Sequence, residues 1–274
     1  MTNSKIAKVD EKRQRPDAPG GTQSIQRATQ ILRLIASRNR TGMRLVDAVQ
    51  HSGLVRPTVH RILKCLISEG LVTQDSLSHR YFLGHLIFEL GLAAAPQFNL
   101  VDICRPSMQR IAEKTKDTVF LTVRSGYDTV CLDRLEGDFP IKTLTLEVGT
   151  RRPLGVGAGG LALLMPLLNE EVDKILSANG VRLMAYNNLN VPSLLKILAR
   201  SRKLGYALND IHVTPGAISL GLPVINFISA PIIAISIGAI KSRMTDERQK
   251  ELVAILNTEV RLLEKLMTKA TDLD

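Results

Sequence analysis

The chain has 274 residues, of which 45% are hydrophobic and 23% charged, and its formal net charge is +10. The length predicts two domains, and the composition is that of a globular protein, not a disordered or fibrous one. Three cysteines lie far apart with no C-x-x-C motif, which argues against a disulfide framework or a metal cluster and fits a reducing cytoplasm. We expect each of them to be a small buried hydrophobic residue: Cys65, Cys104 and Cys131.

The positive charge is concentrated in the first third of the chain. Residues 1–90 hold 14 Lys and Arg against 7 Asp and Glu, a net of +7, whereas residues 91–274 hold 22 against 19, a net of +3. Such a concentration indicates a phosphate-binding surface. An anionic membrane would attract the same charge, but no lipidation signal or spanning helix accompanies it. Nucleic acid is therefore the favoured partner, and no membrane is expected.

The first 22 residues predict a disordered basic arm. They are polar, hold five Lys and Arg with two Pro and a Gly-Gly pair, and lack the apolar stretch of a secretion signal. A solvated tail is the favoured interpretation. An arm that reaches a DNA groove is the alternative.

Residues 23–83 predict a winged helix-turn-helix domain. Ser24 suits the N-cap of a first helix, and a short second helix ends at Gly53, where glycine permits a tight turn. Pro57 suits the first turn of a third helix, and a hairpin is expected between residues 72 and 82. This order of elements is typical of winged helix-turn-helix proteins. The alternative is a helical subdomain with solvated basic residues, which the charge bias disfavours.

The helix that begins near Pro57 has an apolar stripe that includes Val59 and Leu63, and polar and basic residues project from its remaining surface. We expect this helix to enter the major groove of double-stranded DNA, and basic residues outside it to contact the DNA backbone. The predicted DNA-binding residues are Arg44, Arg56, Pro57, Thr58, His60, Arg61, Lys64 and Arg80.

Residues 84–98 predict a linker helix, and residues 99–270 predict a second, α+β domain. Helices are expected over 101–116, 158–168, 170–179, 191–204 and 245–268, and strands over 118–124, 129–135, 141–147, 218–225 and 231–240. The stretch 213–240 holds no charged residue and is long enough to span a bilayer, but Pro215, Pro223 and Pro231 would break such a helix. Buried strands are favoured there instead.

No catalytic or metal-binding constellation is apparent, and we expect neither enzymatic activity nor a cofactor nor a metal. The five His are scattered, with no H-E-x-x-H or G-x-S-x-G motif. The stretch GVGAGG at 155–160 approaches a dinucleotide-binding loop, but no βαβ unit surrounds it. A purely structural DNA-coating protein would leave the separate, nearly neutral second domain unexplained.

A series of short motifs makes the chain resemble the IclR family of bacterial transcription regulators, over essentially everything after Thr22. The motifs are QSIQRA (23–28), TVHR (58–61), RYFLG (80–84), LDRLEG (132–137), GTRRPL (149–154), GY (205–206) and TPG (214–216). The resemblance implies a winged helix-turn-helix, a linker helix and a C-terminal GAF-like effector-binding domain. It also implies a homodimer or a dimer of dimers on a palindromic operator. Its output would be control of a catabolic operon by a small organic acid, with repression favoured over activation.

The resemblance places the effector site around residues 155–160 and on nearby strands. Gly155 and Leu161 stand where the family commonly has His and Lys, so we expect a sparse polar lining and consider an aromatic acid as one candidate ligand. Ordinary packing of small residues is the alternative at each position. The effector-binding residues carried over are Ala158, Gly159, Asn209, Asp210, Ser219, Ser236 and Gly238.

Overall fold

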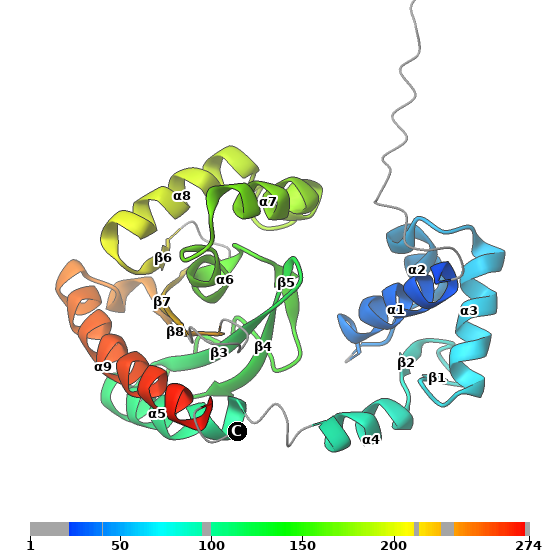
Figure 1. Cartoon of the computed structure of the whole chain (residues 1–274), viewed down its shortest axis with the longest axis horizontal. Coiled ribbons are helices and arrows are strands. Elements are labelled where there is room, and N and C mark those ends of the chain that lie inside the picture. The colour runs from blue at the N-terminus through cyan, green and yellow to red at the C-terminus, as the bar shows by residue number, and fades with distance from the viewer. Residues whose placement is uncertain (1–21, 40, 95–99, 211–213, 226–232, 272–274) are drawn as a thin grey trace, which may run out of the picture. The chain divides into compact units, whose positions relative to one another are not determined.

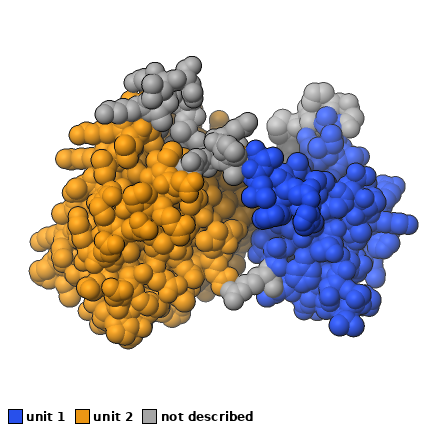
Figure 2. Space-filling view, turned by 90° about the horizontal axis from the view of Figure 1, so that it is seen from below, with its two compact units in different colours: residues 1–93 blue, residues 94–274 orange. Residues whose placement is uncertain are grey.

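The structure is a computed structural model that describes residues 22–39, 41–94, 100–210, 214–225 and 233–271. The chain divides into two units, residues 1–93 and 94–274, each of which forms its own body (Figures 1 and 2). The predicted arm, apart from Thr22, and the end of the predicted linker at 95–98 lie outside the described residues.

The first unit is a three-helix bundle with a two-stranded wing. Its elements are α1 (Gln23–Ala36), α2 (Leu45–Ser52), α3 (Arg56–Ser68), β1 (Val72–Gln74), β2 (Tyr81–Leu83) and α4 (His85–Ala94). Ile31 and Ile35 of α1 pack with Val59 and Leu63 of α3 in a core that Tyr81 of the wing completes. The predicted winged helix-turn-helix is thus confirmed.

Local chemistry explains the ends of these helices. Gly53 has a φ of +68° and caps α2, and Pro57 occupies the first turn of α3, as predicted. The prediction of Ser24 as N-cap is wrong, because α1 already begins at Gln23 and Thr22 precedes it. The helix predicted over 84–98 begins at His85, one residue after the end of the wing, where Leu83 pairs with Val72.

Helix α4 buries none of its side chains, although most of them are apolar. Phe88, Leu90 and Leu92 are all more than half exposed. Within the described part of the chain, α4 thus presents an exposed apolar surface, a feature typical of interaction sites.

The second unit is an antiparallel sheet between two layers of helices (Figure 1). Its strands lie in the order β5-β4-β3-β8-β7-β6, and helices α5 and α9 cover one face while α6, α7 and α8 cover the other. The strands are β3 (Thr118–Ser125), β4 (Asp128–Leu135), β5 (Arg151–Pro153), β6 (Ala207–Asn209), β7 (Ala217–Val224) and β8 (Ile233–Ile240). The helices are α5 (Leu100–Thr115), α6 (Gly157–Leu164), α7 (Asn169–Leu183), α8 (Val191–Leu204), the 3-10 turn η2 (Lys241–Arg243) and α9 (Asp246–Thr271).

The central strands are buried on both faces, with different residues on each. Val119 and Leu121 of β3 pack against α5 and α9, whereas Phe120 and Thr122 face the α6 side. The predicted α+β fold is confirmed, and so are the two apolar strands β7 and β8. No described helix combines the length and the hydrophobicity needed to cross a membrane.

The prediction of a strand over 141–147 is wrong. Residues 149–153 occupy the edge of β4 instead, through Gly149 N–H to Cys131 O (2.8 Å) and Cys131 N–H to Thr150 O (3.0 Å). Residues 141–147 therefore leave the sheet, and they turn their polar side inward: Thr143 is buried while Ile141 and Leu144 are exposed. The short strand β6 was not predicted, since three residues carry too little periodicity.

Ion pairs join the two helices α5 and α9: Arg110 and, at 3.8 Å, Lys114 of α5 both pair with Glu259 of α9. The guanidinium of Arg110 on α5 donates to both carboxylate oxygens of Glu259 on α9, at 2.7–3.1 Å. Glu259 is almost fully buried, and Arg110 also donates to Oγ of Ser107 at 2.8 Å. These ion pairs fix α5 against α9.

Candidate functional site

The first candidate site is the exposed face of α3. Arg56, His60, Arg61 and Lys64 are exposed, and their spacing places them on the side of the helix away from the buried Val59. Pro57 is exposed on the same face. Thr58 is half-buried. The helix thus presents four polar or basic side chains to solvent in one stripe.

An open groove runs between the start of α3 and the wing. It is lined by four of the predicted DNA-binding residues together with polar residues of the wing, namely Arg44, Arg56, Pro57, His60, Gln74, Ser78 and His79. The structure therefore brings the recognition helix and the wing to a common surface.

Two of the predicted basic residues are already engaged by the protein. Arg44 donates to Asp47 at 3.1 Å, and this hydrogen bond and the charge of Asp47 raise the pKa of Arg44. Arg80 donates to the carbonyl oxygens of Thr41 and Gly42 at 3.2 and 3.1 Å. Both contacts hold the segment before α2 in place.

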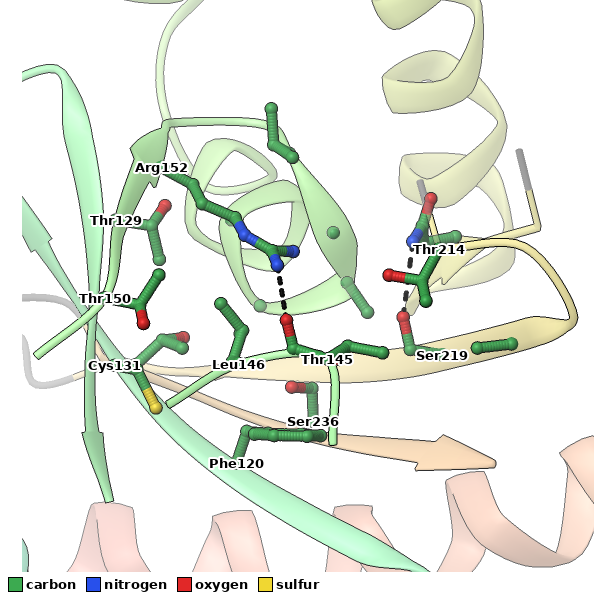
Figure 3. Close-up of a pocket in the computed structure, with 18 of the residues that line it drawn as sticks. Phe120, Thr129, Cys131, Thr145, Leu146, Thr150, Arg152, Thr214, Ser219 and Ser236 are labelled. Carbon is green, nitrogen blue, oxygen red and sulfur yellow. Dashed lines mark hydrogen bonds between the residues drawn. The ribbon is translucent and has the colours of Figure 1, made fainter. Parts of the chain in front are cut away.

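The second candidate site is an enclosed pocket between α6 and the sheet of the second unit (Figure 3). Five of the seven predicted effector-binding residues line it: Ala158, Gly159, Asn209, Ser219 and Ser236. The other two do not. Asp210 instead pairs with Arg200 at 2.6 Å, and Gly238 packs against Phe120 and Thr143.

The pocket is more polar than predicted, so the expectation of a sparse polar lining is wrong. Arg152 extends over the pocket toward Thr145, with Thr129 and Thr150 on one side and Thr214 and Ser219 on the other (Figure 3). The polar lining missed by sequence reasoning is Thr122, Thr129, Thr143, Thr145, Thr150, Arg152 and Thr214. The GTRRPL motif contains Arg152, but nothing in the sequence shows which way its side chain turns.

Two glycines of α6 allow the helix to lie directly on the strands. A Cβ at Gly159 would lie 2.5 Å from Oγ1 of Thr122, and one at Gly160 would lie 2.9 Å from Oγ1 of Thr129. Larger residues at either position would push α6 off the sheet, since protein interiors are close-packed. Gly159 therefore lines the pocket and also determines its depth.

The cysteines differ in their surroundings. Burial raises the pKa of Cys104 to about 12 and that of Cys131, which lines the pocket, to about 11, so both stay protonated thiols. The prediction that all three are buried is wrong for Cys65, which lies exposed on α3.

A winged helix with an exposed basic stripe, on the same chain as a separate unit with an enclosed polar pocket, is the organisation typical of DNA-binding regulators. Comparison with known proteins gives the family. The chain matches the IclR helix-turn-helix domain over residues 24–76 and the bacterial transcriptional regulator IclR C-terminal domain over residues 92–264. The second match alone spans more than half of the chain. The chain belongs to the IclR family, a family of transcriptional regulators and not of enzymes.

Individual relatives agree with this assignment. The chain is 28% identical to the transcriptional repressor IclR of Escherichia coli strain K12 over 242 residues, which cover 87% of this chain and 88% of that protein. It is 28% identical to the acetate operon repressor of Salmonella typhimurium over 260 residues, covering 92% and 94%. Its fold is similar to that of an IclR homologue from Microbacterium hydrocarbonoxydans complexed with 4-hydroxybenzoate, with a TM-score of 0.66, 21% identity and coverage of 90% and 99%.

Proposed function

We propose that the chain is a cytoplasmic repressor of a catabolic operon, and that a small organic acid in the pocket of the second unit controls its binding to a palindromic operator. One observation carries this proposal: an exposed recognition helix and an enclosed polar pocket occur on separate units of one chain. The curated relatives named above are repressors, which favours repression over activation.

In the DNA complex, α3 lies in the major groove. Arg56, His60 and Arg61 face bases or phosphates, and Lys64 contacts a phosphate. Thr58 is half-buried and contributes through the edge of the helix. Arg44 and Arg80 position the segment before α2 and reach the DNA backbone from there.

The regulator acts as a dimer, and α4 supplies the contact between the two copies. The exposed apolar side chains of this helix support that role, because pairing with a second copy of α4 would remove them from water. A two-fold dimer presents two recognition helices, which matches a palindromic operator. A dimer of dimers would add a second such contact elsewhere.

Phe88→Glu is expected to weaken self-association roughly a hundredfold, since a dimer loses two buried phenyl groups at about 1.5 kcal/mol each. Phe88 is 62% exposed in the single chain, so the substitution leaves the fold of the unit intact. Sedimentation velocity across a dilution series measures the effect. Leu77→Glu is the control, because Leu77 is an exposed apolar residue of the wing, 91% exposed, and its replacement should leave the association unchanged. An unaltered association constant for the Phe88 variant would remove α4 from the dimer contact.

The pocket binds the acid among polar groups. Residues 157–159, in the first turn of α6, line the pocket, and the backbone N–H groups of such a turn have no partner within the helix. Such a helix start suits a carboxylate. Ser219, Ser236 and Asn209 add hydroxyl and amide groups, and an aromatic acid is one candidate ligand.

Ser219→Phe tests this role of the pocket. Ser219 is half-buried at the pocket wall, so a phenyl group there occupies the ligand's place and should abolish the response to acids. Operator affinity without ligand should stay within about twofold, since the first unit is untouched. The operator is obtained by selecting random duplexes with the wild-type protein, and acids are screened for release of that operator in gel shifts. Ser177→Phe, at an exposed position of α7, is the control. If no acid alters the operator affinity of the wild type, the proposed effector control is wrong.

A further inference from the structure

We propose that Arg152 is the counter-ion of the ligand's acid group, and that the buried hydroxyls of Thr129 and Thr143 mark two places in the pocket where a second polar group of the same ligand can bind. The inference rests on the proposed effector pocket and names the chemistry of its occupant: a small carboxylate that carries a hydroxyl or another oxygen. It adds a second polar subsite to the start of α6.

Arg152 is a cation without a compensating charge. Its guanidinium donates to the carbonyl oxygen of Thr145 and lies 5.8 Å from the ring of Tyr186. Burial lowers the pKa of Arg152. Among the described residues, no carboxylate forms an ion pair with it. A half-buried charge that faces only neutral groups is costly, and an anion in the pocket would supply the missing partner.

The neighbouring arginine shows the contrast. Arg151 lies on the same strand with its side chain on the opposite face. It pairs with the carboxylate of Asp128 at 3.2 Å and donates to Ser125 Oγ at 3.1 Å. Of two consecutive arginines, the one turned away from the pocket is neutralised by the protein, and the one turned into the pocket is not.

Two buried hydroxyls in the same pocket also lack partners. Thr129 is the cross-strand neighbour of Arg152, so both side chains project from the same face of the sheet. Thr129 and Thr143 are 5% and 7% exposed, and Oγ1 of each has no hydrogen-bond partner within the described part of the chain. An unsatisfied buried hydroxyl is uncommon, because it forfeits its hydrogen bonds to water. Both hydroxyls line the pocket, so an oxygen of the ligand would satisfy whichever of the two it reaches.

The pocket must widen to admit such a ligand. Its volume is about 30 Å³, which is room for about two water molecules. The segment 141–147 is the wall that can move with the smallest loss of backbone hydrogen bonds, because no strand ladder holds it. Arg152 is bonded to this wall through Thr145 O. An acid that takes over the guanidinium would therefore remove one of the hydrogen bonds that hold the segment, while Arg134 still donates to Leu146 O at 3.1 Å.

The first test needs no ligand. Arg152→Met removes the uncompensated charge and keeps an unbranched side chain, so the full-length protein without ligand should melt roughly 2–4 °C higher than the wild type. Arg151→Met is the matched control and should melt lower, because it breaks an ion pair. If Arg152 served only to hold Thr145, Arg152→Met would melt lower as well, and the proposal would fail.

The second test uses matched pairs of acids and primary amides: pyruvate, lactate, benzoate and 4-hydroxybenzoate, each against its amide, in thermal-shift titrations. The acids should stabilise the wild type, and the amides should not. Arg152→Met should bind the acids on the order of a hundredfold more weakly, and Arg152→Lys should retain part of the affinity for them. Equal stabilisation of the wild type and Arg152→Met by an acid would overturn the proposal. If no acid in the panel binds, the ligand-free comparison decides.

The two hydroxyls are tested with the same compounds. Thr129→Val and Thr143→Val keep the shape of the side chain and should weaken the hydroxylated acids more than benzoate. An equal loss for benzoate and 4-hydroxybenzoate would exclude the hydroxyl subsite. A different result would contradict the proposed function and leave the ligand chemistry intact: acids would bind the pocket, but the operator affinity of the wild type would not change.

Discussion

Arg110→Ala is expected to lower the free energy of unfolding of the second unit by about 3 kcal/mol, the lower end of the range for breaking a buried ion pair. The reason is that Glu259 stays almost fully buried when its hydrogen-bonded partner is removed, and among the described residues only Lys114, at 3.8 Å, still forms an ion pair with it. The effect lies at the lower end because Arg110 is 39% exposed and water can partly replace it. Urea unfolding followed by tyrosine fluorescence measures this unit, since three of the four tyrosines lie in it.

The pH dependence of this loss has a defined sign. Burial by itself raises the pKa of Glu259, but the hydrogen bonds from Arg110 and Ser107 outweigh it, so the pKa lies below its usual 4.5. The pair therefore contributes its full stability above about pH 4.5 and loses it as the pH falls through the lower folded value. The difference between wild type and Arg110→Ala should shrink in acid. Arg261→Ala, at an exposed position of α9, is the control and should change stability by less than about 0.5 kcal/mol. A pH-independent difference would contradict this account.

Arg61→Ala is expected to cost about 1–3 kcal/mol per half-site. On a palindrome this reduces the affinity of a dimer roughly thirtyfold or more. Arg61 is exposed on α3, so its removal should leave the circular dichroism and the dimer unchanged. Gel shifts on the selected operator and on a scrambled duplex measure the loss.

Two lysine variants distinguish the loss of sequence-specific binding from a general weakening of DNA binding. Lys64→Ala, which removes a proposed phosphate contact, should weaken both duplexes alike and reduce the salt dependence of binding. Lys196→Ala removes one positive charge from an exposed position of α8 and should change neither. Unchanged operator affinity in Arg61→Ala would mean that α3 does not read the DNA as proposed.

Elements governed by local chemistry could be predicted from the sequence. Gly53 and Pro57 mark the ends of the helix-turn-helix because each favours a particular backbone conformation wherever it occurs. The strands β7 and β8 were predictable because three prolines exclude the competing membrane helix. The alternation of apolar and polar residues over 141–147 indicated a strand, but such alternation shows only that the two sides of the segment lie in different environments. Whether a partner strand is present depends on the rest of the fold.

The pocket was harder to predict than the fold. Small residues such as Ala158 and Ser219 could be placed in it through the resemblance to a family. Arg152 could not, because Arg151 and Arg152 are identical neighbours and only the pairing of Thr129 with Arg152 decides which one turns inward. Thr143 was missed because apolar residues usually face the interior, whereas in this segment the polar Thr143 is buried and its apolar neighbours are exposed.

The segment 141–148 has a consequence for how ligand choice can change. Thr143 and Thr145 line the pocket. The residues between and beside them are exposed on the outer surface, namely Ile141, Leu144 and Val148. The barrier between the two is a single extended chain. A substitution that alters the pocket-lining side of this segment also shifts its solvent-exposed side. The choice of ligand and the outer surface of the protein therefore cannot change independently here. Positions on β7 and β8, which have a second layer of protein behind them, are free of that constraint.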